Sequence, residues 1–260
     1  MIVLVCEDSM EGIYSSIFRA YEMHCDLEDT KIVIAGRYEP EFFADYRQIQ
    51  PDRERAVRVQ RTLLREFGED NHRKISLALL SECPDKADAV YHMIAEGLKK
   101  KLGKRILENL SDPYTMRVME LWRGTENEFF HLRGFLRFRE LENGILYAAM
   151  QPKHQVLHPL MEHFCDRFPG ENFIIHDTNR RSMAVHPAYG GWYYTEPPEG
   201  EWESSLQYSE EEFLYSAWFR EFCRSIAIKE RKNLSLQTQM LPLRFRPNMT
   251  EFKEDTKTSQ

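Results

Sequence analysis

The sequence predicts an α+β fold with an N-terminal strand–helix–strand, a helical middle section, and a C-terminal antiparallel sheet followed by a long final helix. Three observations lead to this prediction. The chain starts with an apolar run, residues 2–5, that leads into a helical pattern. From residue 52 to about residue 130 apolar side chains recur at helical spacing, and after Gly134 they alternate with polar ones. With 260 residues, of which 42% are hydrophobic, the chain can bury the core of one or two domains.

Residues 1–50 are predicted to form the strand–helix–strand unit. Ile2 to Val5 has the length and apolar character of a short buried strand. Asp8 and Glu11 stand at the spacing of a helix N-cap and its N3 residue, and an apolar helical stripe follows them. Residues 31–35 give a second strand, after which the chain is irregular and aromatic.

Residues 51–130 are predicted to be a helical section. Apolar positions line one helix between Ala56 and Phe67, and residues 72–80 form a second. Pro84 suits the first position of a third helix, because the first turn of a helix leaves its N–H groups unpaired in any case. Ser111-Asp112-Pro113 is a typical start for a fourth helix.

Residues 131–250 are predicted to carry two hairpins that flank a helix. Residues 135–140 alternate, Glu142-Asn143-Gly144 supplies a tight turn, and residues 145–150 return as the second strand. A helix then ends near Phe168, with Pro159 either in its first turn or kinking it.

The second hairpin pairs residues 173–176 with residues 182–185, and residues 192–194 are a candidate for one more strand. Ser209 and the three glutamates after it start the long final helix, which continues to Ile226. Residues 251–260 are polar, and we expect a frayed tail. The three predicted sections could also form one compact domain.

The composition excludes several classes of protein. The net charge is −7 and the sequence pI is about 5.8, so a polybasic protein is excluded and any nucleic-acid contact must come from a local patch. Five scattered cysteines without a CxxC pair favour a reducing compartment and exclude a zinc ribbon. No apolar run approaches the roughly 20 residues of a membrane helix. We expect a cytoplasmic protein with no membrane contact and no bound cofactor.

The histidines are the first candidates for chemistry. His154 and His158 have the i, i+4 spacing of metal ligands, with Asp177 as a third, but a proline directly after His158 interrupts the helical register and we expect no metal site. His163, His176 and Asp177 are candidate catalytic acid–base residues. Each also has a structural interpretation, His163 as a packed or capping residue and Asp177 as the first residue of a turn.

Basic residues cluster in spite of the acidic total, and Arg outnumbers Lys. Arg133, Arg137 and Arg139 are expected on one face of the strand over residues 135–140, because they lie an even number of positions apart. Like charges on one face repel, so such a row usually has a partner, which can be a phosphate, a carboxylate or an aromatic ring. The basic residues that could extend this face are Arg180, Arg181, Arg231, Lys232, Arg244 and Arg246. In the alternative interpretation, acidic residues such as those between Glu196 and Glu212 neutralise these cations within the fold.

Two groups of motifs resemble a known family. The first comprises His131-Leu-Arg-Gly-Phe-Leu-Arg-Phe-Arg-Glu140, the hairpin through Tyr147, His163-Phe164 with Arg167, and Phe173-Ile-Ile-His-Asp177 with Arg180. The second comprises Arg231-Lys-Asn233 with Gln237, Pro242, Arg244-Phe-Arg246 and Met249-Thr-Glu251. Together they resemble the uncharacterised bacterial "probable DNA metabolism protein" family, a domain of unknown function, over nearly the whole chain.

Members of that family are typically encoded beside a radical SAM protein with a role in DNA modification or repair, and some are fused to a uracil-DNA glycosylase-like domain. The resemblance implies no catalytic residues. Because this sequence lacks the radical SAM cysteine triad and 260 residues leave no room for a fused glycosylase, it implies an accessory protein with a radical SAM partner.

The sequence therefore supports three hypotheses. The first is an accessory protein of DNA metabolism that binds DNA or its radical SAM partner through a face of these arginines and nearby aromatic residues. The aromatic residues are Phe135, Tyr147, Trp192 and Tyr193. The second is an enzyme, a hydrolase or base-processing activity, that uses His163, His176 and Asp177. The third is a protein–protein scaffold whose exposed arginine and aromatic residues form an interface.

Overall fold

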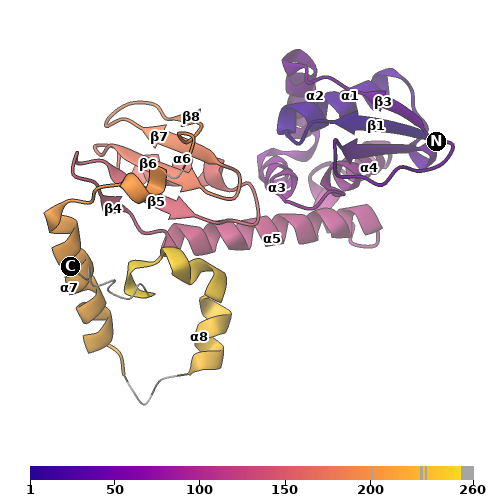
Figure 1. Ribbon diagram of the computed structural model, residues 1–260. Coiled ribbons are helices and arrows are strands. Elements are labelled where there is room, and N and C mark those ends of the chain that lie inside the picture. The colour runs from indigo at the N-terminus through magenta and orange to yellow at the C-terminus, as the bar shows by residue number, and fades with distance from the viewer. Residues whose placement is uncertain (201, 229–230, 232, 253–260) are drawn as a thin grey trace. The chain divides into compact units, whose positions relative to one another are not determined.

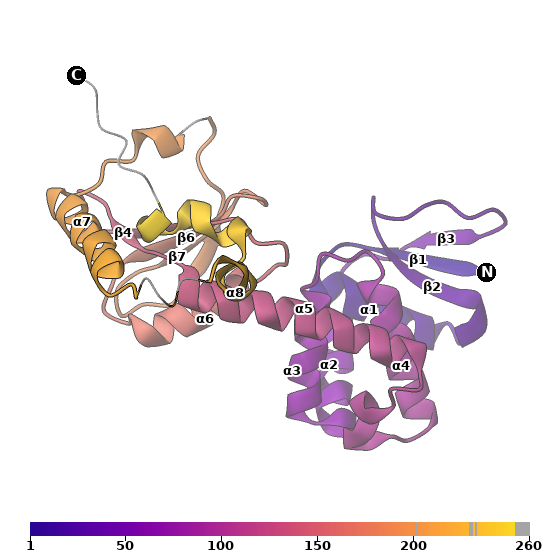
Figure 2. The same ribbon diagram turned by 90° about the horizontal axis from the view of Figure 1, so that it is seen from below.

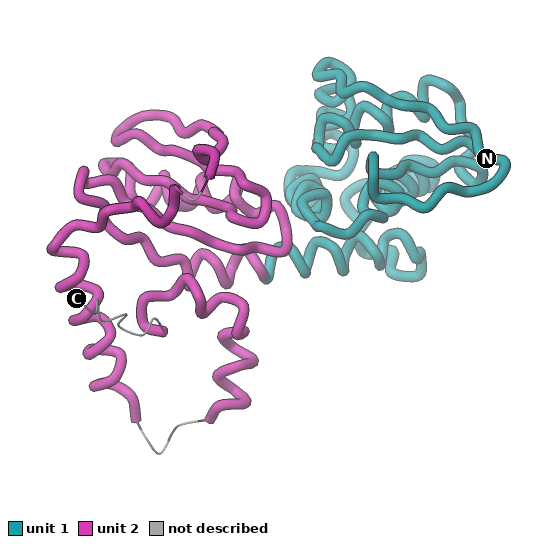
Figure 3. Tube along the Cα trace, viewed as in Figure 1, with its two compact units in different colours: residues 1–127 teal, residues 128–260 magenta. Residues whose placement is uncertain are grey.

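The computed structural model describes residues 1–200, 202–228, 231 and 233–252. The chain divides into two compact units, residues 1–127 and residues 128–260 (Figure 3). Each unit has its own sheet and its own apolar core. The predicted α+β fold is confirmed: strands begin the chain, helices fill its middle, and a second sheet and later helices follow (Figure 1).

The first unit contains a three-stranded parallel sheet. Its strands are β1 (Ile2–Cys6), β2 (Thr30–Ile34) and β3 (Asp45–Gln48), in the order β2-β1-β3. Leu4 and Val5 of the central strand point to opposite faces and are both fully buried, so both faces of the sheet are covered. The expected irregular stretch contains β3, which forms because the second edge of β1 is open to a partner strand.

Four helices and two short 3-10 turns complete the residues before α5 (Pro113–Phe135). They are α1 (Met10–Glu22), α2 (Arg53–Phe67), α3 (Glu69–Leu79) and α4 (Lys86–Lys99), with 3-10 turns at Leu27–Asp29 and Gly103–Glu108. The cap of α1 is Ser9, not Asp8, because the Ser9 hydroxyl accepts the Gly12 N–H at 3.0 Å. Asp8 is instead an ion-pair partner.

Asp8 neutralises a lysine inside the first unit. The side chain of Lys86 is 1% exposed, and its Nζ lies 2.5 Å from Oδ1 of Asp8. The same ammonium donates to the Ser81 carbonyl at 2.7 Å. A buried ammonium group is tolerated only when it is paired in this way.

The second unit contains a mixed five-stranded sheet. Its strands are β4 (Arg139–Glu140), β5 (Leu146–Met150), β6 (Phe173–Asp177), β7 (Ser182–His186) and β8 (Tyr193–Thr195), in that spatial order. Neighbouring strands are antiparallel except β5 and β6, which run parallel because α6 (Leu157–Arg167) connects them as a crossover. Pro159 lies in the first turn of α6 and does not kink it.

The two faces of this sheet differ. Ala148, Phe173 and Ile175 point toward α6 and form the core with its residues Leu160 and Phe164. Tyr147 and His176 point to the opposite face, because side chains alternate along a strand. This second face carries the candidate pocket.

The strand predicted over residues 135–140 is largely wrong. Helix α5 (Pro113–Phe135) starts where the sequence predicts but continues through Phe135, so β4 keeps only two residues. Leu132 and Leu136 are both buried, and helical spacing places them on one side of the helix. The Leu136 N–H extends the helical pattern by donating to the Leu132 carbonyl at 2.8 Å.

The C-terminal part contains two helices and several short turns. They are α7 (Glu210–Ser225) and α8 (Leu234–Met240), with 3-10 turns at Trp202–Ser205, Leu243–Asn248 and Thr250–Phe252. Ser209 caps α7 as predicted, and its N–H donates to the Glu140 carbonyl, so α7 begins beside β4 (Figure 2). Most of the predicted tail, residues 253–260, lies outside the described residues. In the described parts of the chain, every helix is too short or too polar to cross a membrane.

The pairing of Asp8 with Lys86 gives a test of the first unit. We predict that Asp8→Ala lowers its free energy of unfolding by about 3 kcal/mol, because the variant leaves a buried ammonium group without a carboxylate. Hydrogen–deuterium exchange of the β1 amides in the full chain should then be about 100-fold faster. The double variant Asp8→Ala with Lys86→Met should recover much of the protection. Unchanged exchange in Asp8→Ala would mean that the Ser81 carbonyl alone satisfies the ammonium.

Candidate functional site

The three arginines predicted on one strand face do not form a row. Arg133 lies in the last turn of α5, Arg137 lies in the connection after it, and only Arg139 lies in β4. The physical reason is the continuation of α5, which buries Leu132 and Leu136. Arg133 is exposed and its guanidinium lies 5.0 Å from the centre of the Phe130 ring.

Arg137 and Arg139 are paired with carboxylates from the C-terminal part of the chain. Arg137 Nη2 lies 2.7 Å from Oε1 of Glu251. Arg139 Nε lies 3.4 Å from Oε1 of Glu212, and its guanidinium is 3.5 Å from the centre of the Tyr208 ring. These two arginines attach the C-terminal segments to the sheet, in agreement with the alternative of neutralisation within the fold.

Arg180 and Arg244 also have internal partners. Arg180 binds Oδ2 of Asp177 at 3.0 Å and the carbonyl of Lys153 at 2.6 Å. Arg244 Nη2 lies 3.0 Å from Oε1 of Glu128, whose side chain is fully buried. The other Glu128 oxygen accepts the His154 N–H at 2.6 Å. Both arginines therefore stabilise the loops that follow β5 and β6.

The remaining predicted basic residues have different surroundings. Arg246 stacks on Phe252 at 4.9 Å, and its Nε and Nη2 are buried without a hydrogen-bond partner among the described residues. Arg231 is exposed. Arg181 is exposed and lines the pocket described below. Lys232 lies outside the described residues.

Of the three candidate acid–base residues, only His176 lines the pocket. His163 lies on α6, where its ring packs edge-on against Phe164 with centres 5.0 Å apart, and burial with Arg133 nearby lowers its pKa. Asp177 opens the turn after β6: its Oδ1 accepts the Asn179 N–H at 3.1 Å. Burial raises the pKa of Asp177, while the neighbouring Arg180 opposes this shift. Within the described residues, no group of three or more His, Cys, Asp or Glu side chains could hold a metal ion.

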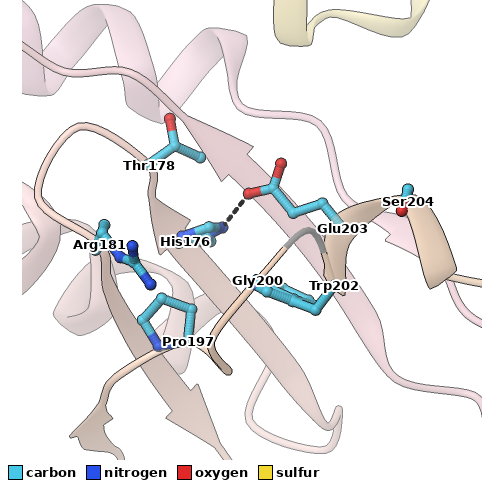
Figure 4. Close-up of a pocket in the computed structure, with 8 residues that line it drawn as sticks. All are labelled: His176, Thr178, Arg181, Pro197, Gly200, Trp202, Glu203 and Ser204. Atoms are coloured by element: carbon cyan, nitrogen blue, oxygen red, sulfur yellow. Dashed lines mark ion pairs between the residues drawn. The ribbon is translucent and has the colours of Figure 1, made fainter.

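The pocket lies on the sheet face opposite α6 and has a volume of about 420 Å³. Its lining comes from β6, from the turn between β6 and β7, and from the segment before α7, as Figure 4 shows. The residues are His176, Thr178, Arg181, Pro197, Gly200, Trp202, Glu203 and Ser204. The volume falls within the range of small-molecule sites.

The His176 ring is held by two polar neighbours at one nitrogen. Its Nδ1 lies 2.9 Å from the Tyr147 hydroxyl. The same nitrogen lies 3.2 Å from Oε1 of Glu203 (Figure 4). A carboxylate only accepts hydrogen bonds, so we assign the ring proton to Nδ1. Burial lowers the pKa of His176, with Glu203 opposing, and this favours the neutral ring. The Nε2 atom then has a free lone pair, and it is buried without a hydrogen-bond partner among the described residues.

The positions of three residues in this site were not predicted. Tyr147 reaches His176 only because β5 and β6 are neighbours, whereas the sequence assigned them to separate hairpins. Trp202 and Glu203 lie in the acidic stretch between Glu196 and Glu212, which the sequence analysis considered only for its charge. The one available signal was the tryptophan itself, a large apolar side chain among charged residues.

Helix α7 presents its apolar stripe to the outside. Leu214, Trp218 and Phe222 follow one another at helical spacing with Tyr215 and Phe219 beside them, and these five residues define the α7 apolar stripe. Each is between 37% and 58% exposed. The buried residues of α7 are the polar Glu212 and Ser216. This is the reverse of an ordinary surface helix, which buries its apolar side.

Comparison with known proteins identifies a family for most of the chain. The family described as "Domain of unknown function (DUF4130)" matches residues 84–251. The chain matches none of the curated proteins. The matched region includes all of the second unit's sheet, the His176 pocket and α7.

The low pKa of His176 leads to a test of the pocket's electrostatics. Because the folded pKa lies below the unfolded value, the unfolded chain binds the extra proton first, and stability falls as the pH drops below about 6.5. We predict that His176→Gln reduces the slope of unfolding free energy against pH between pH 7 and 5.5, by at most one proton or about 1.4 kcal/mol per pH unit. Urea denaturation at several pH values measures this slope. A slope in His176→Gln equal to that of the wild type would contradict the assignment.

Proposed function

The chain belongs to the DUF4130 family, and we propose that it is an accessory protein of DNA metabolism that binds a protein partner through the α7 apolar stripe. The partner in this proposal is the radical SAM protein that the sequence resemblance implies. One observation carries it: the largest apolar side chains of α7 are exposed while polar residues of the same helix are buried.

Exposing an apolar stripe to water costs free energy, and a partner that covers the stripe removes this cost. Large contiguous apolar patches are rare on monomeric proteins and usually mark an interaction surface. Trp and Tyr are also the residues that contribute most to binding at protein interfaces. Leu214, Trp218 and Phe222 have the i, i+4, i+8 spacing of a helix that lies in an apolar groove. The expected binding surface of the partner is therefore an apolar groove.

The charged residues at the two ends of α7 can fix the orientation of a bound partner. Glu210 and Glu211 stand in the first turn, and Arg224 stands in the last turn. Rim charges of opposite sign at the ends of an apolar surface fix the orientation of a partner more than its affinity. A complementary groove would carry cations near the start of α7 and an acidic group near its end.

DNA is less well supported than a protein as the ligand of the predicted arginine face. Arg137, Arg139, Arg180 and Arg244 are each paired with a carboxylate of the same unit. A phosphate would have to displace those carboxylates, and the released charge would offset much of the attraction. In the proposed complex, contact with the DNA backbone therefore falls mainly to the partner.

Substitutions in the stripe give a sharp test of partner binding. We predict that Trp218→Ala and Phe222→Ala each weaken binding to the radical SAM protein by about 30-fold or more, because truncating an interface hot spot costs about 2 kcal/mol. Isothermal titration with the purified partner measures the affinity. The fold should be unaffected, since both side chains are more than half exposed in the free protein.

Phe213→Ala is the matched control. Phe213 is an aromatic residue of the same helix and is 61% exposed, but its helical position lies outside the stripe. Its removal should leave the affinity nearly unchanged. An equal loss in all three variants would mean that the effect is not specific to the stripe. An affinity that falls steeply between 50 and 300 mM salt would point to charge rather than to the apolar stripe.

A further inference from the structure

The His176 pocket holds a hydrogen-bond acceptor that no described residue satisfies. The side chain of His176 is 3% exposed, and its Nδ1 is occupied by Tyr147 and Glu203. Its Nε2 is buried and has no partner among the described residues. Such an unsatisfied buried acceptor destabilises the folded chain, so its presence in a pocket calls for a donor from a ligand or from water.

The same pocket holds a cation, Arg181, for which the described part of the chain provides no ion-pair partner. Among the described residues, no carboxylate forms an ion pair with Arg181, in contrast to the adjacent Arg180. Arg181 also has a φ of +50°, in the left-handed region that a residue other than glycine rarely adopts. Strain of this kind persists when the surrounding structure holds it, and it concentrates at ligand sites. An unpaired guanidinium there suits a phosphate or carboxylate.

A flat apolar wall completes the pocket. Trp202 is fixed edge-on to Tyr147, with ring centres 5.9 Å apart and planes at 87°, and its ring centre lies 5.5 Å from that of His176. Pro197 lines the same pocket (Figure 4). An indole held in this way is a stacking surface for an aromatic ring, and stacking accepts any base because each base has a π-face.

We propose that the pocket binds a nucleotide, with its base against Trp202, an N–H of the base donated to Nε2 of His176, and its phosphate on Arg181. A nucleotide supplies the three features that the pocket lacks: a flat heterocycle, an N–H donor and an anion. The ligand can be a free nucleoside monophosphate or one nucleotide of a single strand, since both carry this chemistry. The site is separate from the α7 stripe, so it can be correct or wrong independently of partner binding.

The test is isothermal titration of the full-length protein with the four deoxynucleoside monophosphates, the matching nucleosides and a five-nucleotide single strand. We expect binding of at least one monophosphate or of the strand. Arg181→Ala should weaken monophosphate binding about tenfold or more and leave nucleoside binding nearly unchanged, because only the phosphate contacts the guanidinium. Trp202→Ala should weaken the binding of all three ligand types about tenfold or more.

The controls separate a site in this pocket from general charge attraction. Arg133→Ala removes an exposed arginine outside the pocket and should bind as the wild type does. Arg181 and Trp202 are not core residues, so these variants should fold. Binding of the strand alone, with the same dependence on Trp202, would identify a strand as the source of the nucleotide. No binding at millimolar ligand, or binding by both Arg181→Ala and Trp202→Ala that is as strong as that of the wild type, would overturn the site and leave water as the partner of Nε2.

Discussion

The parallel pairing of β5 with β6 is the constraint on which the second unit depends. It aligns Ala149 with His176, so that Tyr147, two residues earlier on β5, lies on the same face as the histidine and can reach its Nδ1. It also brings the C-terminal ends of β5 and β6 to the same end of the sheet, where the chain turns after each strand. Had the strands formed two separate hairpins, as their sequences alone suggest, Tyr147 and His176 would have no fixed relation.

The loops at that end of the sheet explain why Arg180 and Arg244 are not available to a ligand. Arg180 binds the carbonyl of Lys153 from the loop after β5, and it also binds Asp177 in its own turn. Glu128 accepts the N–H groups of Lys153 and His154 and pairs with Arg244. Loops at the end of a parallel pair leave backbone groups without strand partners, and these side chains satisfy them. For Arg181, the next residue in sequence, no such contact is formed among the described residues.

The features that depend on local spacing could be predicted from the sequence, and those that depend on distant partners could not. Ser209 as the cap of α7 and Glu142-Asn143-Gly144 as a turn follow from short-range chemistry, and the structure has both. The end of α5 was mispredicted because Leu132 and Leu136 fit a helix while the residues after Gly134 also alternate. The ion pair of Arg137 with Glu251 joins residues 114 positions apart, and no local pattern in the sequence predicts it.

The orientation of α7 follows from the same charge pairing. Glu212 accepts hydrogen bonds from the Arg139 guanidinium, the Glu140 N–H and the Ser216 hydroxyl, so the side of α7 that carries Glu212 must face the sheet. Turning the helix over to bury Trp218 and Phe222 would leave Arg139 without its carboxylate and the Glu140 N–H without an acceptor. Breaking a mostly buried ion pair costs about 3–5 kcal/mol, which is comparable to what burying the two aromatic side chains would return in a surface position. The pairing that neutralises Arg139 of the predicted arginine face is therefore also what exposes the α7 apolar stripe, the surface that we propose as the protein-binding one.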